Sequence, residues 1–246
     1  MHETLRKTIQ GIPVVDYYTF WEEFEWQQSK HITIIGTTGC GKTTLELELM
    51  SEREYVIFLG TKELDETQAE LGPLGFKLAT APEEITLDIS KKWVLHPGRI
   101  KLRGESAQEM RQRLRSFYQN ALDYTFAQTA WAVVIDEGRF ICQFLGLKDE
   151  VQLLYLQGRS QHNSVVMGTQ RPAWVPLEAF DAATHLFFFK DNDQKNISRI
   201  AELAGLDKRA VQLAVPQLES TEDEGGQFLY YNTRSDQMLI SKVELE

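Results

Sequence analysis

The segment from Gly36 to Thr43 constrains the fold of this chain more than any other. It matches the phosphate-binding pattern G-x-x-x-x-G-K-[ST] in full. A short apolar run, His31 to Ile35, precedes it, and a helical pattern starting at Lys42 follows it. The alternative, a glycine-rich turn that fits the pattern by chance, would need both flanks to agree by accident. The sequence therefore predicts a phosphate-binding loop between a strand and a helix.

The residue types of this loop suit the chemistry of phosphate binding. Glycines let the backbone curl so that successive N–H groups point inward at phosphate oxygens, and the helix that follows adds its N-terminal dipole. We expect Lys42 to reach the β- and γ-phosphates and the hydroxyl of Thr43 to bind Mg²⁺. The predicted nucleotide-binding residues are Gly36, Thr37, Thr38, Gly39, Cys40, Gly41, Lys42, Thr43 and Thr44.

Strand-like and helical patterns alternate along the chain, which predicts an α/β fold with a mostly parallel central sheet flanked by helices. The expected strands are His31–Ile35, Tyr55–Leu59, Trp93–Leu95, Trp131–Ile135, Ser164–Met167 and His185–Phe189. The expected helices are Lys42–Arg53, Glu105–Phe126, Lys148–Gln161, Asp193–Ala204 and Lys208–Leu213. Two further strand-like runs, Gln227–Tyr231 and Gln237–Val243, predict a C-terminal β-hairpin, and the acidic stretch before it, Glu219–Gly226, reads as a solvated loop.

Two adjacent carboxylates, Asp136 and Glu137, follow the apolar strand Trp131–Ile135. Asp136 is expected to hold the Mg²⁺ shell, and Glu137 can polarise a water for attack on the γ-phosphate. A nucleotide kinase has to exclude water, so the adjacent pair favours hydrolysis. The alternative is two solvated acids at a strand end.

Three polar residues near the strand Ser164–Met167 are further candidates. If this strand inserts between the phosphate-loop strand and the Asp136 strand, the amide of Gln170 lies near the γ-phosphate and can orient the attacking water. Arg159 ends the preceding helix; it is either a surface charge or an arginine that enters a neighbouring subunit's site in a ring-shaped ATPase. Arg171 is a second candidate for that arginine.

Taken together, the phosphate loop, Asp136-Glu137, Gly158-Arg159, Thr169-Gln170-Arg171-Pro172 and the strand from Ala183 to Phe189 resemble the FtsK/HerA branch of RecA-like, additional-strand, catalytic-glutamate P-loop ATPases. The resemblance covers roughly Lys30 to the end. It implies ATP as the nucleotide and a RecA-like core. Members of that family typically move double-stranded DNA through a central pore. The chain has no room for the membrane helices, β-barrel, DNA-reading module or nuclease that larger relatives carry, so it looks most like a compact viral genome-packaging ATPase.

The resemblance implies a Mg²⁺-ATP-driven motor that acts on double-stranded DNA as a homo-oligomeric ring, a pentamer or a hexamer. A portal or another assembly protein is an expected partner, and the cytoplasm, of the host cell if the protein is viral, is the expected location. Two alternatives stay open: a nucleotide-switched assembly or secretion ATPase that acts on a protein partner, and a nucleotide kinase. A GTPase is disfavoured because no Asn-Lys-x-Asp sequence occurs.

The formal net charge of −10 excludes a protein that coats nucleic acid with its whole surface. The segment Lys91–Phe117 nevertheless carries eight basic and two acidic residues, so its formal charge is +6 and that of the remainder is −16. Within it, His96–Gly104 reads as a loop with alternating basic and apolar residues, and we expect Arg99, Lys101 and Arg103 to contact DNA phosphates. The arginines of the following helix, Arg111, Arg113 and Arg115, are expected to be a solvated face.

The chain is expected to be a single domain, with an N-terminal helical and aromatic extension over 1–29 and an ATPase core over 30–246. The aromatic-rich segment Asp16–Gln28 is read as a helix packed on the sheet edge in preference to a partner-binding face. Two cysteines, Cys40 and Cys142, lack the spacing of a zinc site and indicate a reducing compartment. The sequence shows neither a basic-then-apolar leader at Met1 nor an apolar run of membrane-spanning length.

Overall fold

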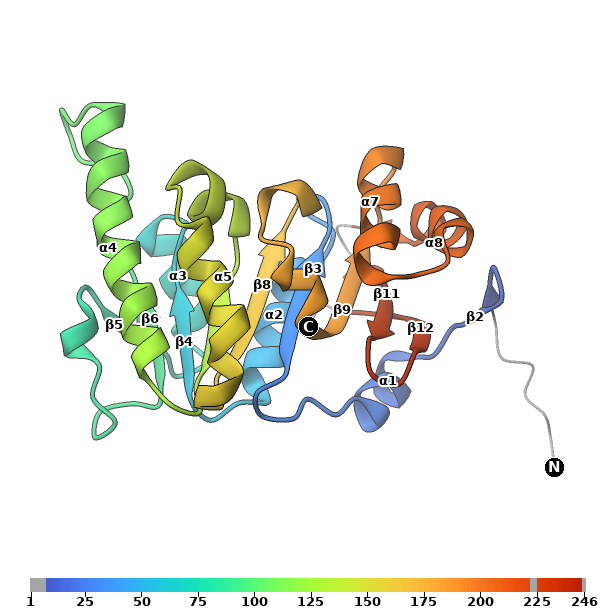
Figure 1. The fold of residues 1–246 in the computed structure, drawn as a ribbon. Helices are drawn as coiled ribbons and strands as arrows, with labels where there is room; N and C mark the ends of the chain where they lie inside the picture. The colour runs from blue at the N-terminus through green and yellow to red at the C-terminus, as the bar shows by residue number, and fades with distance from the viewer. Residues whose placement is uncertain (1–7, 222–224, 245–246) are drawn as a thin grey trace.

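A computed structural model of the chain describes residues 8–221 and 225–244. Its centre is a sheet of ten strands in the order β10-β11-β9-β3-β8-β7-β4-β6-β5, with β12 paired to β11 (Figure 1). The run from β9 to β5 is parallel, whereas β10, β11 and β12 pair in antiparallel fashion. This confirms the predicted mostly parallel sheet with a C-terminal hairpin.

The strands of the sheet are short and mostly buried on both faces. They are β3 (His31–Ile35), β4 (Val56–Leu59), β5 (Lys77–Ala79), β6 (Lys92–Leu95), β7 (Ala132–Ile135), β8 (Ser164–Thr169), β9 (Ala183–Phe189), β10 (Ser220–Thr221), β11 (Gly225–Asn232) and β12 (Gln237–Lys242). A separate two-stranded hairpin joins β1 (Thr8–Ile9) to β2 (Ile12–Pro13).

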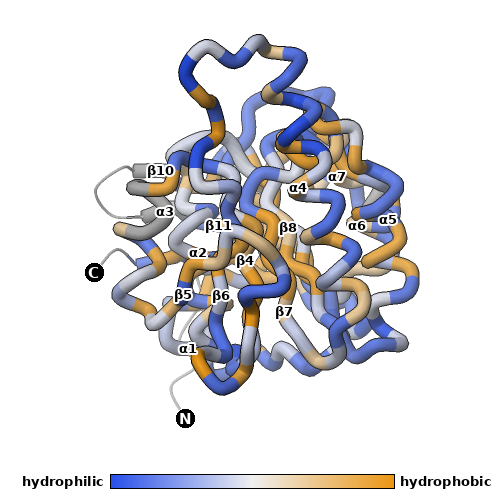
Figure 2. Tube along the Cα trace, turned by 90° about the vertical axis from the view of Figure 1, so that its left-hand side faces the viewer, coloured by the Kyte–Doolittle hydropathy of each residue, from blue (hydrophilic) through white to orange (hydrophobic). Residues whose placement is uncertain are grey.

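Helices cover both faces of the sheet and divide the core into two apolar layers. Successive strand residues point to opposite faces, so Ile34 belongs to one layer and Ile35 to the other. The helices over the Ile34 face are α1 (Tyr17–Glu23), α2 (Lys42–Ser51) and α3 (Leu64–Leu71). Those over the Ile35 face are α4 (Ala107–Ala127), α5 (Lys148–Gln157), α6 (Glu178–Asp181), α7 (Gln194–Ala204) and α8 (Lys208–Ala214). Figure 2 shows the hydrophobic colour concentrated in the interior strands.

Short helical turns make several of the connections. They are the 3₁₀ turns at Pro82–Glu84, Gly158–Gln161, Pro172–Trp174 and Val215–Gln217, and a π-helical turn at Phe140–Phe144.

The strand order confirms the insertion that the sequence suggested, because β8 pairs with β3 on one side and with β7 on the other. As a result the ends of β3, β7 and β8 meet at one edge of the sheet, which we call the carboxyl edge. The opposite, amino edge carries the starts of the same strands and the turn of the β11–β12 hairpin.

Some predicted boundaries differ from the structure for local reasons. The helix predicted from Glu105 begins at Ala107, because Ser106 and Glu109 form a reciprocal capping box. The helix predicted to reach Gln161 leaves α-geometry after Gln157 and continues as a 3₁₀ turn. Of the predicted acidic loop, Ser220–Thr221 instead pairs with Gly225–Gly226, and residues 222–224 lie outside the described chain, as does the start at Met1.

The aromatic N-terminal segment forms a helix that is shorter than predicted. Asp16 caps α1 by accepting a hydrogen bond from the Thr19 backbone N–H at 3.0 Å. From α1, Phe20 is buried against rings on β9 and β11 at centroid distances of 5.1 to 6.1 Å. The helix therefore lies on the face of the sheet near the terminal hairpin, not at a sheet edge. Within the described residues, no helix combines the length and the apolar character that crossing a bilayer requires.

Candidate nucleotide-binding and hydrolysis site

The predicted phosphate loop connects β3 to α2 at the carboxyl edge, and its glycines are sterically required at two positions. A Cβ atom on Gly36 would lie 2.5 Å from the Cys40 Sγ and 2.6 Å from the Phe189 Cβ. Gly41 has a φ of 101°, in the left-handed region that residues other than glycine rarely adopt. The loop therefore follows a tight path that side chains at these positions would block.

Lys42 lies at the first turn of α2 and bends back over the loop. Its Nζ donates to the Thr37 carbonyl at 2.7 Å, which holds the ammonium above the curled backbone. Thr37, Thr38 and Gly39 are exposed, and Thr43 is half-buried at the helix start. The loop backbone, the Lys42 ammonium and the Thr43 hydroxyl thus lie at the start of α2, and their role in binding phosphate stays a prediction.

Asp136 directly follows β7 at the same edge and is 8% exposed. Its Oδ1 accepts a hydrogen bond from the Thr61 hydroxyl at 2.9 Å, and its Oδ2 lies 3.5 Å from the Lys62 Nζ. Burial acts to lower the pKa of Lys62, but the charges of Asp136 and Glu70 outweigh it and raise that pKa. Asp136 is thus oriented by two groups from the end of β4.

Glu137 is in contact with Gln170, the polar residue that follows β8. The Gln170 Nε2 donates to the Glu137 Oε2 at 3.3 Å, while the Glu137 Oε1 is buried without a hydrogen-bond partner. Burial, and next the charge of Asp136, raises the pKa of Glu137. A carboxylate with a raised pKa and a free acceptor oxygen is suited to take a proton from water.

A cleft of about 570 Å³ opens beside these two residues. Arg111, Arg139 and Phe144 line it together with Glu137 and Gln170. Arg139 stacks over the Trp174 ring at 4.0 Å, and Arg171 lies 5.1 Å from the same ring. Arg171 is therefore on the carboxyl edge of its own subunit's site.

Glu46 is a site residue that the sequence reasoning missed. It is 1% exposed, and its Oε1 has no hydrogen-bond partner. Burial, and next the charge of Asp136, raises its pKa well above the ordinary value, while Lys42 and Lys62 oppose the shift. The signal was its position four residues after Lys42, which places both side chains on one face of α2.

Thr61 and Lys62 were missed as well. Both follow β4, the neighbour of β7, and polar residues directly after a parallel strand reach the edge where ligands bind. That position was the available signal for them.

The oxygen donors at this edge fit a magnesium ion. Mg²⁺ prefers hydroxyl and carboxylate oxygens together with substrate phosphates, and Thr43 and Asp136 supply such oxygens beside the unpartnered carboxylate oxygens of Glu46 and Glu137. Thr43 and Asp136 are the residues that would hold the ion, whose charge would offset that of the phosphates.

Arg159 lies at the opposite edge from its own phosphate loop. It belongs to the 3₁₀ turn Gly158–Gln161, which precedes the start of β8. There it lines a cavity with His31, Thr184 and Arg234, all at the amino edge. The structure therefore does not bring Arg159 together with Glu137 and Gln170 in one subunit.

The basic segment Lys91–Phe117 divides into two parts. The expected solvated arginine face on α4 holds for Arg111, which is exposed, and only in part for Arg113 and Arg115, which are half-buried and hydrogen-bonded. Arg113 Nε donates to Glu105 at 2.8 Å, and Arg115 binds the Leu145 carbonyl at 2.6 Å. These side chains hold neighbouring segments of the chain together.

The loop before α4 is the other part, and it projects from the body at the carboxyl edge (Figure 1). His96 anchors its start: its Nε2 lies 2.7 Å from the Lys62 carbonyl, and its Nδ1 accepts from the Gly98 N–H at 3.1 Å. Among the described residues, none of Arg99, Lys101 and Arg103 takes part in an ion pair. Their role toward DNA remains a prediction.

No protein-family model matches the chain, and no curated protein matches it. Solved structures do. B204, the DNA-packaging ATPase of Sulfolobus turreted icosahedral virus, aligns with a TM-score of 0.58 at 16% identity, over 90% of this chain and 100% of that one. The genome packaging NTPase B204 of Sulfolobus turreted icosahedral virus 2, in complex with ATP-γS, aligns with a TM-score of 0.55 at 14% identity, over 89% and 100%.

VirB4 of Thermoanaerobacter pseudethanolicus also aligns, with a TM-score of 0.55 at 13% identity, over 88% of this chain and 90% of that one. At identities this low the likeness establishes the fold and leaves the activity open. The predicted resemblance is confirmed at that level: the chain has the fold of FtsK/HerA-type P-loop ATPases.

Proposed function

We propose that this chain is a Mg²⁺-dependent ATPase that moves double-stranded DNA through a homo-oligomeric ring. The observation that carries the hydrolytic part is the contact between Glu137 and Gln170 at the carboxyl edge, where the phosphate loop also lies. One Glu137 oxygen is bound by the amide and the other is free, so the carboxylate is oriented with an acceptor available for a water proton. A nucleotide kinase has to exclude water from its site, so a carboxylate placed to activate water favours hydrolysis.

The proposal that the cargo is DNA rests on the loop before α4. Within the described chain its cations form no ion pair, and it projects at the same edge as the nucleotide site, so nucleotide-dependent movement there can be passed to a bound duplex. The fold shared with DNA-packaging B204 supports the same cargo and a packaging role, with a portal or another assembly protein as partner.

Stimulation of ATP hydrolysis by duplex DNA tests this cargo. We expect duplex to raise the steady-state rate several-fold, and the double variant Lys101→Ala/Arg103→Ala to lose that stimulation and to show a shallower salt dependence, because fewer phosphates are neutralised. The variant Lys195→Ala/Lys208→Ala removes the same charge from exposed positions elsewhere and should respond like the unchanged chain. If the unchanged chain hydrolyses ATP but ignores DNA, the assembly or secretion ATPase acting on a protein partner replaces our proposal.

We further propose that Arg159 acts on the nucleotide of a neighbouring subunit in the ring. Support comes from its place at the amino edge, away from its own Glu137. Arg159→Ala should lower the hydrolysis rate about a hundredfold or more, because transition-state charge loses a cation. Mixing Arg159→Ala with Glu137→Gln subunits should restore part of the activity, since some interfaces then combine an intact arginine with an intact glutamate. Mixtures no more active than the separate variants would contradict a role across subunits.

A further inference from the structure

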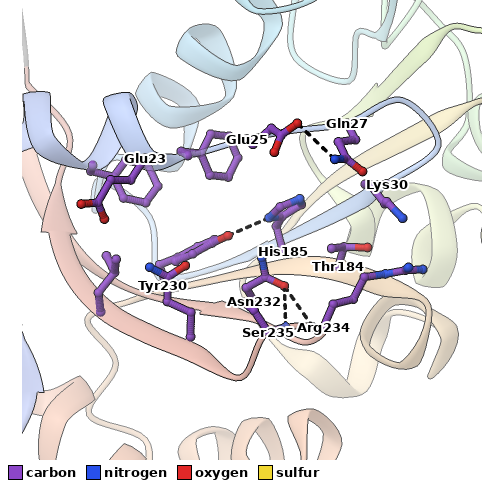
Figure 3. A pocket seen from close by; sticks show the side chains of 14 residues that line it. Glu23, Glu25, Gln27, Lys30, Thr184, His185, Tyr230, Asn232, Arg234 and Ser235 are labelled. Atoms are coloured by element: carbon purple, nitrogen blue, oxygen red, sulfur yellow. Dashed lines mark hydrogen bonds between the residues drawn. The ribbon is translucent and has the colours of Figure 1, made fainter.

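A cavity of about 340 Å³ lies between α1, the loop that follows it and the β11–β12 hairpin (Figure 3). Thr184 and His185 at the start of β9 line it, so it opens at the amino edge of the sheet. The phosphate loop lies at the other edge. The cavity is therefore separate from the nucleotide site, and a ligand bound there would not be bound by the phosphate loop.

His185 lines this cavity and carries a buried polar atom without a hydrogen-bond partner. The side chain is 2% exposed; its Nδ1 lies 2.8 Å from the Tyr230 hydroxyl, and its Nε2 has no hydrogen-bond partner. A buried polar group without a partner destabilises the fold, and a ligand that accepts its hydrogen bond removes that cost. When the Tyr230 hydroxyl donates to Nδ1, the free Nε2 carries a proton and can donate it to a ligand oxygen.

Two cationic side chains lie beside His185 in the wall of the cavity. Lys30 and Arg234 both line the cavity, and Figure 3 shows their charged ends on the same side of it. In the described part of the chain neither forms an ion pair. Burial, and next the charges of Arg234 and Arg159, lowers the pKa of Lys30. This side of the cavity thus holds positive charge that no described carboxylate balances.

The other side of the cavity differs in character. Phe24 and Leu239 contribute apolar surface, and Glu23 lies across from the two cations in Figure 3. Glu25 accepts a hydrogen bond from Gln27 at 3.1 Å. A ligand with one anionic end and an apolar, hydroxyl-bearing body would therefore bind in one orientation, with its anion at Lys30, Arg234 and His185.

We propose that this cavity is a second ligand site, which binds a phosphate monoester through Lys30, Arg234 and the Nε2 of His185. A guanidinium pairs with phosphate oxygens in bidentate fashion, and an ammonium adds a point charge. Two sources share this chemistry: a free compound of mononucleotide size, for which pockets of this volume are suited, and the 5′-phosphorylated end of a DNA strand. The proposal does not depend on hydrolysis or translocation by the chain.

Side-chain ¹H–¹⁵N spectra of the histidines test the site directly, because they report on the Nε2 of His185. The full chain carries Lys42→Ala, so that binding at the phosphate loop is weakened, and His185→Phe assigns the signal. The probes are AMP, a 5′-phosphorylated DNA duplex and the same duplex without the phosphate. We expect AMP or the phosphorylated duplex to shift the His185 signal to saturation with a dissociation constant of about 1 mM or lower.

Lys30→Ala and Arg234→Ala should each weaken that binding at least about tenfold. Lys77→Ala removes an exposed lysine at the far end of the sheet and should leave it unchanged. A response to AMP alone identifies a free monoester as the ligand, and a response to the phosphorylated duplex alone identifies a DNA end. No shift with any probe, equal shifts with both duplexes, or shifts that survive both cation variants would overturn the proposal.

Discussion

The carboxyl edge and the amino edge of the central sheet differ in the titratable side chains that they bury. At the carboxyl edge the buried groups are acids, and Lys42 and Lys62 lie close enough to offset part of their charge. At the amino edge Lys30, Arg159 and Arg234 lie beside two buried neutral rings, His31 and His185, whose pKa burial lowers to about 4.

This difference follows from how the strands meet. Loops after parallel strands converge on one edge and bring polar residues from separate segments into a single site. At the other edge the starts of β3, β8 and β9 meet the turn of the β11–β12 hairpin, which brings Arg159, Lys30 and Arg234 together. The acids of the carboxyl edge are suited to a cation such as Mg²⁺ beside the phosphates, whereas Lys30 and Arg234 at the amino edge are suited to an anion.

The largest expected effect is the loss of ATP hydrolysis when the proposed catalytic base at the carboxyl edge, Glu137, is replaced. Glu137→Gln keeps the shape of the side chain but removes its ability to accept a proton, so we expect hydrolysis to fall by a factor of about 10²–10⁴ while ATP binding persists. Steady-state rates and equilibrium binding of ATP measure the two quantities. Asp123→Asn, at an exposed position on α4, is the matched control. Normal hydrolysis by Glu137→Gln would remove Glu137 as the base.

A smaller effect, a loss of folding stability, is expected when a substitution crowds the buried acids of the carboxyl edge. A Cβ atom on Gly168 would lie 2.3 Å from the Glu46 Oε1 and 2.6 Å from the Asp136 carbonyl oxygen. Gly168→Ala should therefore lower the free energy of unfolding by about 1–3 kcal/mol, which urea denaturation measures. Gly158→Ala, at the amino edge, meets no atom closer than 3.8 Å and should cost much less. Equal stabilities of the two variants would show that the carboxyl edge is not tightly packed.

Acid should destabilise the protein through the amino-edge histidines. Both have a folded pKa of about 4 against an ordinary 6.5, so between these values the unfolded chain binds protons that the folded chain does not. The contribution of each ring is fully present above pH 6.5 and falls toward pH 4, by roughly 3 kcal/mol per ring. His185→Gln should reduce this slope in urea denaturation, whereas His162→Asn, at an exposed position, should not. If the stability of His185→Gln falls with acid as steeply as that of the unchanged chain, His185 does not cause the acid sensitivity.

The carboxyl edge should respond to pH in the opposite sense. Because the pKa of Glu46 is raised in the folded state, that state retains a proton which the unfolded chain releases above pH 4.5. The contribution of Glu46 is therefore present at acidic pH and is lost as the pH rises through the folded pKa. Glu46→Gln should gain stability relative to the unchanged chain on going from pH 5 to pH 9. A difference between the two that does not vary with pH would show that Glu46 is ionised in the folded state.

Sequence patterns predicted the central strands closely because those strands are continuous apolar runs between turn residues. The short β5 and the helix α3 were not predicted, since neither has a strong pattern of its own. The residues of the phosphate loop, Asp136 and Glu137 could be found because each adjoins a recognisable strand. Glu46 could not be distinguished from an ordinary helix carboxylate, because its burial arises only when β8 and Gly168 pack against α2.

By itself, the sequence determined the local elements and the loop geometry, because glycine positions, caps and apolar periodicity act over a few residues. It therefore specified the phosphate loop, the strand that delivers Asp136 and Glu137, and the mostly parallel order of the fold. Only the tertiary structure decided which charges meet. It brought Gln170 into contact with Glu137, paired Arg113 with Glu105, and set Lys30, Arg234 and His185 around one cavity. Such contacts join residues far apart in the chain, and their energies depend on burial and distance, neither of which a linear sequence contains.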